Sequence, residues 1–186
     1  MTAPASQRWS LPMRGLHWGM AALLVVLLGL GLAMAYGTFD LGQTFALYQW
    51  HKSLGVLVMP LVTLRLMLRL GGRHPGPSTH QARARWAPLE AGLARIVHGL
   101  FYLLMVALPL TGWLVVSSSP LHLPTRPFNL FTLPDLVAPD ANVYASASQL
   151  HAILAYLMIG ALTLHILGGL KHRFVDRDST LSRMGM

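Results

Sequence analysis

Histidines are the residues of this 186-residue sequence whose chemistry and spacing stand out. Nine are present and cysteine is absent, which excludes disulfides, thiolate metal sites, iron–sulfur clusters and covalent haem attachment. His151 and His165 are 14 residues apart. On a helix this spacing is about 21 Å of rise, and it brings the two side chains to within about 40° of one direction. One helix could therefore supply one axial ligand to each of two stacked haems.

Membrane-spanning helices must carry these histidines, because the composition excludes an ordinary soluble domain. Hydrophobic residues make up 54% of the sequence and charged residues 11%, whereas a soluble domain has about 25% charged residues. Crossing about 30 Å of hydrocarbon takes about 20 helical residues. Four apolar stretches are long enough, and we expect helices near residues 14–37, 48–70, 92–117 and 147–171. The sequence predicts an all-α integral membrane four-helix bundle, a single domain over residues 1–186.

The positive charges predict how the bundle is oriented. An even number of spans puts both termini and the middle loop on one side of the membrane. Every Lys and Arg falls on that side except Lys52 and Arg126. Because basic loops stay in the cytoplasm, both termini are expected there, in a multi-pass protein of the bacterial inner membrane. The net charge of +8 is thus interpreted as an orientation signal for insertion into lipid, and nucleic-acid binding is not expected.

The depths of the histidines predict how they pair. His51 lies near the outer start of the second helix, at a depth comparable with His151, whereas His17 lies near the cytoplasmic start of the first helix, nearer His165. We predict an outer haem between His51 and His151 and a cytoplasmic haem between His17 and His165, with the irons about 20 Å apart. Six-coordinate iron is suited to electron transfer. The alternative for each histidine is an imidazole that meets headgroups or bonds a neighbouring helix.

Further basic residues are predicted at the depth of the cytoplasmic haem. His98 could be a ligand, a haem-propionate partner or a quinone contact, and we expect it beside the haem, not on the iron. Arg65, Arg69 and Arg95 could bond the haem propionates by charge-assisted hydrogen bonds. The orientation rule alone also accounts for arginines at this depth.

Short motifs along the chain carry a family resemblance. They are Arg14-Gly15-Leu16-His17-Trp18, Trp50-His51-Lys52-Ser53-Leu54-Gly55, Ala94-Arg95-Ile96-Val97-His98, Ala107-Leu108-Pro109-Leu110-Thr111-Gly112, Leu150-His151-Ala152 and Leu164-His165. In combination they resemble the bacterial cytochrome b561 proteins, which are four-helix di-haem membrane cytochromes. The resemblance covers nearly the whole chain. It implies the four axial ligands already expected, His17, His51, His151 and His165, with two haem b groups as cofactors.

The resemblance also implies an activity, that of a quinone-linked oxidoreductase. Its characterised relatives oxidise superoxide at the outer face and reduce ubiquinone. Lys52 and Arg126 are the outer cations that could draw a small anion. His172, Arg85 and His98 lie on the side where the resemblance implies a quinone.

Two other functions fit the same histidines. The chain could be the haem-bearing membrane anchor of a larger dehydrogenase such as a hydrogenase, with a soluble redox partner. It could also be a transporter or metal-handling protein without haem, which an absorption spectrum would distinguish from either cytochrome.

Overall fold

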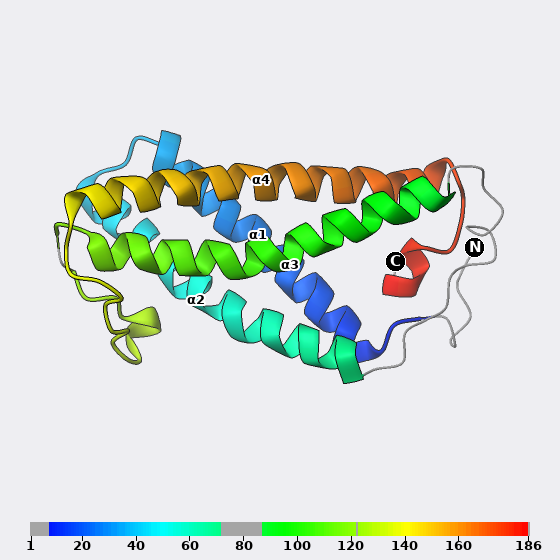
Figure 1. Ribbon diagram of the computed structural model, residues 1–186, viewed down its shortest axis with the longest axis horizontal. Helices are drawn as coiled ribbons and strands as arrows, with labels where there is room; N and C mark the ends of the chain where they lie inside the picture. Colours follow the sequence, from blue (N-terminus) through cyan, green and yellow to red (C-terminus); the bar gives the residue numbers. More distant parts are fainter. Residues whose placement is uncertain (1–7, 72–86, 122, 186) are drawn as a thin grey trace.

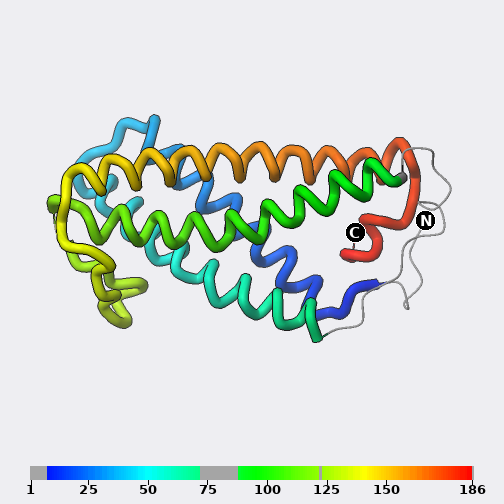
Figure 2. The backbone as a smooth tube through the Cα atoms, in the orientation of Figure 1, coloured from blue at the N-terminus to red at the C-terminus, as the bar shows by residue number. Residues whose placement is uncertain are grey.

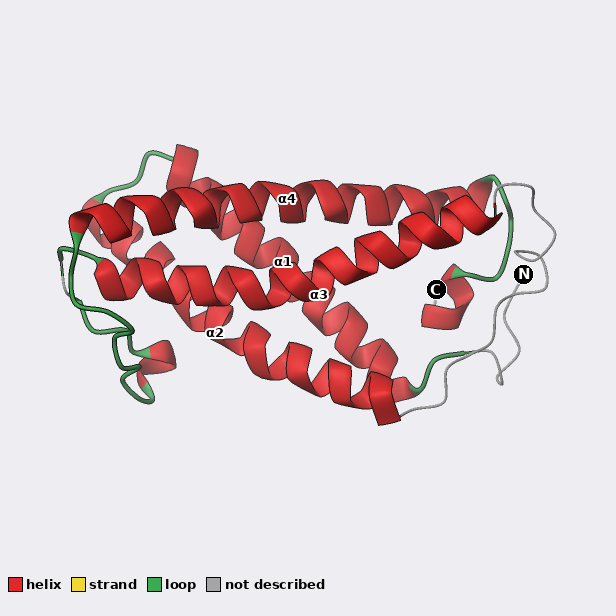
Figure 3. Cartoon of the chain, in the orientation of Figure 1, coloured by secondary structure: helices red, strands yellow, loops and turns green. Residues whose placement is uncertain are grey.

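Four long helices make up the computed structural model of the chain, which describes residues 8–71, 87–121 and 123–185 (Figure 1). In chain order they are α1 (Leu11–Tyr36), α2 (Leu41–Gly71), α3 (Ala87–Ser118) and α4 (Ala141–Phe174). Two short 3-10 turns follow the last two helices, η3 (Pro127–Asn129) and η4 (Leu181–Met184). Over the described residues Figure 3 contains helices and loops and no strand. The prediction of an all-α four-helix bundle is confirmed.

Each of the four helices is long and apolar enough to cross a membrane. The mean hydropathy of the most apolar 18-residue window lies between 1.7 in α2 and 2.2 in α1. Large apolar side chains point outward along the bundle, among them Leu103, which is 64% exposed, and Leu167, which is 56% exposed. A soluble surface rarely carries so much exposed apolar area. The chain is therefore a multi-pass membrane protein whose outer surface faces lipid.

Local caps explain why two helices begin earlier than the apolar pattern predicts. The Gln43 backbone N–H donates to Asp40 Oδ1 at 2.8 Å, while the Asp40 N–H donates to Gln43 Oε1 at 3.2 Å. This reciprocal capping box starts α2 at Leu41, well before residue 48. Asp140 likewise accepts hydrogen bonds from the N–H groups of Asn142 and Val143, and α4 begins at the next residue, six before residue 147. Both caps lie outside the apolar spans.

The helices pack in a chain of neighbours. α1 packs on α2, α2 on α3 and α3 on α4, whereas α1 and α4 share no comparably extensive interface. The buried core draws on all four helices and contains Met20, Leu27, Val58, Val62, Leu104, Met105 and Met158. In Figures 1 and 2 the ends of α1 and α2 at the right diverge from the α3–α4 pair, and η4 lies between them. We call this the terminal end, and the opposite end, which carries the loop of residues 119–140, the loop end.

Candidate functional site

The first histidine pair lies toward the loop end. His51 of α2 and His151 of α4 face each other with their ring centroids 6.2 Å apart and their planes at 76°. Two imidazoles that bind opposite faces of one metal ion, each through a nitrogen about 2 Å from the metal, have centroids about 6 Å apart. The pair thus has the separation that one iron between the rings requires.

A hydrogen bond from α3 sets the protonation of His151. The Thr111 hydroxyl donates its single proton to Ala107 O at 2.8 Å, with Leu108 O at 3.0 Å as a second acceptor. Its oxygen lies 3.0 Å from His151 Nδ1 and, with the hydroxyl proton on Ala107 O, is placed to accept the Nδ1 proton. The other ring nitrogen, Nε2, is left with a lone pair, which is the form of histidine that binds a metal.

Glycines let two helix backbones approach this pair closely. A Cβ atom placed on Gly112 would lie 3.2 Å from Cε1 of His151, and one placed on Gly31 would lie 3.6 Å from Cε1 of His51. The first distance is tighter than an ordinary contact, so a side chain at Gly112 would press on the His151 ring. Neither of these roles, for Thr111 or for Gly112, was predicted from the sequence.

The second histidine group lies toward the terminal end and includes three imidazoles. His17 of α1 and His165 of α4 have ring centroids 6.1 Å apart, with their planes at 64°. His98 of α3 lies closer to His165, at 5.3 Å between centroids, and Phe101 packs edge-on to the same ring at 5.4 Å. His17 is therefore the partner of His165 whose separation matches the His51–His151 pair, and His98 lies beside them.

The hydrogen bonds of His17 and His98 give the two rings opposite protonation. Arg65 Nη2 lies 3.0 Å from His17 Nδ1, and because a guanidinium only donates, this nitrogen accepts. His98 Nδ1 lies 2.6 Å from Ala94 O, and because a carbonyl only accepts, this nitrogen carries the proton. Arg65 belongs to α2, so all four helices contribute a side chain to this cluster.

The other predicted propionate partners that the structure describes form their hydrogen bonds with other residues. Arg69 Nη1 donates to the Tyr102 hydroxyl at 3.5 Å, and its guanidinium lies 5.5 Å from the centre of that ring. Arg95 Nε donates to Ala91 O of its own helix at 3.2 Å and is exposed. Among the three predicted arginines, Arg65 is the one that the structure brings into contact with a histidine of the site. Arg85 lies outside the described residues.

The loop at the other end of the bundle brings the predicted outer cations to one corner. The Phe128 N–H donates to Ser53 Oγ at 3.0 Å, and Ser53 is 6% exposed. Ser53 follows Lys52 directly and Phe128 is two residues after Arg126, so this bond brings together the backbone segments that carry the two basic residues. Trp50, next to His51, packs edge-on to the Phe128 ring with centroids 6.5 Å apart.

A polar network surrounds His172 at the end of α4. Its Nδ1 lies 3.0 Å from Asp178 Oδ2 and 3.1 Å from Asp176 Oδ2. Burial opposes ionisation of Asp178, but hydrogen bonds from Thr180 and the charge of His172 outweigh it and hold the Asp178 pKa below its usual value. Lys171 Nζ bonds Glu90 and Asp176 at 2.9 and 2.8 Å. The carboxylates of this network are thus paired with the basic side chains of Lys171 and His172.

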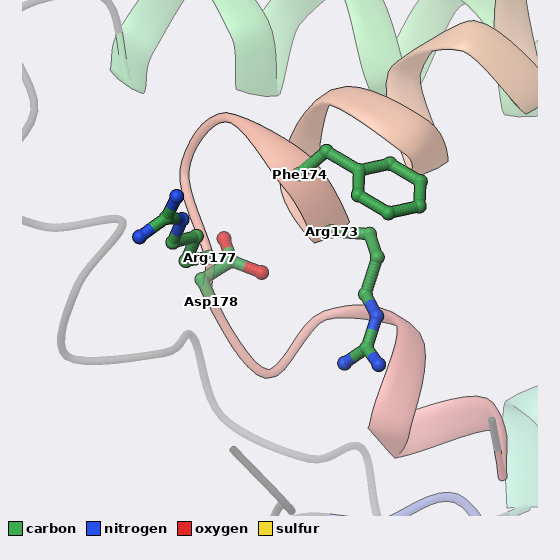
Figure 4. A pocket seen from close by; sticks show the side chains of 4 residues that line it. All are labelled: Arg173, Phe174, Arg177 and Asp178. Atoms are coloured by element: carbon green, nitrogen blue, oxygen red, sulfur yellow. The ribbon is translucent and has the colours of Figure 1, made fainter.

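A cavity of about 330 Å³ lies beside this network (Figure 4). Arg173, Phe174, Arg177 and Asp178 line it, and the two guanidinium groups lie on either side of the Asp178 carboxylate. It is lined by none of the five histidines discussed above as possible haem residues, so it is separate from both histidine groups.

Paired histidines between the helices of an apolar four-helix bundle define a class of protein, the membrane-embedded b-type cytochromes. The comparisons with known proteins agree with this class. The sequence profile of prokaryotic cytochrome b561 matches residues 8–185. The chain belongs to the prokaryotic cytochrome b561 family, which implies haem b as the cofactor and a role in electron transfer.

Three curated relatives cover most of the chain. Cytochrome b561 homolog 2 of Escherichia coli K12 is 30% identical over 96% of this chain and 91% of its own length. "Probable superoxide oxidase CybB" of Yersinia pestis is 29% identical over 91% of each protein. Cytochrome b561 homolog 1 of Escherichia coli K12 is 27% identical over 91% of this chain and 92% of its own length.

Proposed function

We propose that the chain is a di-haem oxidoreductase of the bacterial inner membrane that takes electrons from superoxide at its outer face and delivers them to ubiquinone. The observation that carries this proposal is the pair of matched histidine separations, 6.2 Å toward the loop end and 6.1 Å toward the terminal end. The terminal end faces the cytoplasm in this proposal, because the basic residues gather there.

The four histidines are the proposed axial ligands. His51 and His151 hold the outer haem, and His17 and His165 hold the cytoplasmic haem. The haems supply one-electron chemistry when bound. The protein orients the ligands: Thr111 fixes His151 with Nε2 free, in support of binding at that nitrogen.

Arg65 and His98 are proposed to act beside the cytoplasmic haem. Metal binding at Nε2 of His17 requires the ring proton on Nδ1, where a guanidinium cannot also donate. Arg65 is then free to bond a haem propionate. His98 is proposed to stay a neighbour of the ligand pair, because its ring centroid lies 5.3 Å from that of His165, closer than the 6.1 Å between His17 and His165.

The outer corner is the proposed entry point for superoxide. Lys52 and Arg126 are the cations proposed to attract a small anion there, on a side where the loop also carries Asp135 and Asp140. Ser53 holds the loop on which Arg126 lies. The relative from Yersinia pestis that bears the name of a superoxide oxidase supports this choice of donor. Each superoxide loses one electron and becomes dioxygen.

The proposed acceptor is ubiquinone on the cytoplasmic side. Reduction of one quinone to quinol takes two electrons, hence two superoxide ions, and two protons. His172, which is within hydrogen-bond distance of Asp178 and Asp176, is a proposed quinone residue at that end. Arg85 and His98 are the other proposed quinone residues.

Haem content and rapid kinetics test the proposal. The purified chain should bind two haems, and His51→Ala and His165→Ala should each remove about one of them. Stopped-flow mixing with superoxide should reduce the haems, and added ubiquinone should reoxidise them. A colourless protein after expression with ample haem would refute the cytochrome function. Reduction by quinol alone, with no response to superoxide, would refute the donor.

A further inference from the structure

The end of the chain folds back across the terminal end of the bundle and bonds to the start of α1. The Trp9 backbone N–H donates to Arg183 O at 3.1 Å. The Trp18 indole Nε1–H donates to Met184 O at 3.0 Å. We call residues 178–185, which include η4, the C-terminal strap.

The same strap is anchored to the end of α4. The Asp178 side chain is 3% exposed, lies 3.0 Å from His172 Nδ1 and accepts the Thr180 backbone N–H at 2.8 Å. A Cβ atom on Gly169 would lie 3.5 Å from Cδ1 of Leu181, so this leucine packs against a bare stretch of the α4 backbone. The strap therefore connects α4 with α1, the two helices that otherwise share little packing.

Gly185, the last described residue of the strap, allows the strap to pass close to α1. Gly185 has a φ of 92°, which favours glycine, and a Cβ atom there would collide with the Arg14 guanidinium. The chain at this point fits tightly against α1.

The anchors place the strap directly beyond the cytoplasmic histidine pair. Trp18 follows His17 in sequence, and their ring centroids are 5.1 Å apart. Gly169 lies four residues beyond His165, which is about one helical turn or 6 Å along α4. In Figures 1 and 2, η4 lies between the diverging ends of the helices. His17 and His165 lie next to the space between α1 and α4. The strap thus spans the water-facing end of this space.

We infer that the C-terminal strap keeps water-soluble redox partners away from the cytoplasmic haem and so restricts its acceptor to molecules that arrive from the bilayer. The inference rests on the proposed haem ligands and adds a determinant of acceptor specificity. The strap blocks approach along the bundle axis, whereas an apolar quinone approaches through lipid from the side, where α1 and α4 pack weakly.

Inverted membrane vesicles test the inference, because they present the cytoplasmic face to added reagents. The haems are first reduced, and their oxidation is then followed after mixing with ferricyanide, which does not cross the membrane, or with a short-chain ubiquinone. The variants are Trp18→Phe, which removes the indole hydrogen bond, and a chain ending at Thr180, which removes η4 and keeps Asp178. The matched control is Trp113→Phe, because the Trp113 indole donates to Pro134 O at 2.9 Å at the opposite end.

We expect Trp18→Phe to raise the ferricyanide rate about fivefold, the change in open population that corresponds to a lost hydrogen bond of about 1 kcal/mol. The shortened chain should show a larger increase, although loss of the Arg183 charge would by itself slow an anionic oxidant. The ubiquinone rates should stay unchanged, and Trp113→Phe should match the unmodified protein with both oxidants.

Two results would overturn the inference. One is a ferricyanide rate that is the same in all four proteins, and the other is a parallel change with both oxidants in the Trp18→Phe and shortened proteins. The proposed function fails separately, if the unmodified protein has no haem or its reduced haems do not respond to ubiquinone.

Discussion

Substitution of Thr111 by valine tests how the chain prepares one histidine for haem. Valine has nearly the shape of threonine but no hydroxyl, so His151 Nδ1 loses the acceptor that lies 3.0 Å away. The Thr111 proton is already used on Ala107 O at 2.8 Å, which makes the hydroxyl an acceptor toward the ring. Without it the half-buried ring keeps the Leu108 backbone as a partner but loses the hydroxyl that favours the form with Nε2 free.

The expected loss follows from the role of such supporting hydrogen bonds. Removing the partner of a metal-binding histidine lowers metal affinity about 10- to 100-fold, or about 1.4 to 2.7 kcal/mol. The loss should fall on the outer haem alone, because the His17–His165 pair lies about four helical turns away along α4. Thr111→Ser keeps the hydroxyl and should bind haem as the unmodified chain does.

Haem titration of the purified protein measures this effect. Haem-free protein is titrated with haem, and the two binding steps are resolved by absorbance, with His51→Ala as the reference for a protein that has only the cytoplasmic site. Thr111→Val should weaken one step and leave the other unchanged. The assignment of the His151 proton to Nδ1 would be refuted if Thr111→Val bound each of the two haems with the same affinity as the unmodified chain does.

Three further predictions concern the loop, the histidine cluster and the end of α4. Ser53→Ala should free the loop from α2 and raise the KM for superoxide several-fold at unchanged haem content, with Ser53→Thr as the rescue; an unchanged KM would argue against positioning by this bond. His17→Ala should remove the cytoplasmic haem, whereas His98→Ala should retain both haems and shift only the reduction potential of one. Loss of a haem in His98→Ala but not in His17→Ala would make His98 the ligand and His17 its neighbour. Asp178→Asn should lower the Tm at pH 7, because the lowered pKa of this carboxyl stabilises the fold above the unfolded pKa of about 3.9. This difference should shrink as the pH falls from about 4 through the lowered pKa of Asp178, at which the folded chain also takes up the proton. A gap that persists at low pH would show that the charge of Asp178 is not the cause.

The helices and the facing of the histidines could be predicted because both follow from short-range rules. Apolar length predicts a span, and the 14-residue spacing of His151 and His165 predicts that both rings face one way on α4. Helix boundaries were less accessible. α2 and α4 extend beyond the apolar stretches to polar caps at Asp40 and Asp140, which hydropathy does not detect. The Asp-x-x-Gln pattern of a capping box, which starts at Asp40, can nevertheless be recognised in the sequence.

The residues that support the histidines could not be predicted in the same way. Thr111 and Gly112 lie within a motif that the sequence analysis quoted, yet their contacts with His151 depend on how α3 and α4 pack. The same limit applies to Arg65, Arg69 and Arg95, which sequence places at one depth. Of the three, Arg65 is the one that packing brings within hydrogen-bond distance of a histidine of the site.

The two ends of the bundle differ in a way that gives the proposed electron transfer a direction. At the loop end, the Ser53 side chain and the Phe128 backbone hold the loop that carries Arg126 beside the outer histidine pair. At the terminal end, the strap bonds to Trp18 and closes the water-facing approach to the other pair. In the proposed function, water-soluble donors therefore have access to one haem and lipid-soluble acceptors to the other. A chain with two identical ends would exchange electrons with the donor and with the acceptor at both faces. In the proposed function, this asymmetry means that electrons pass from the donor to the acceptor only by way of the haems.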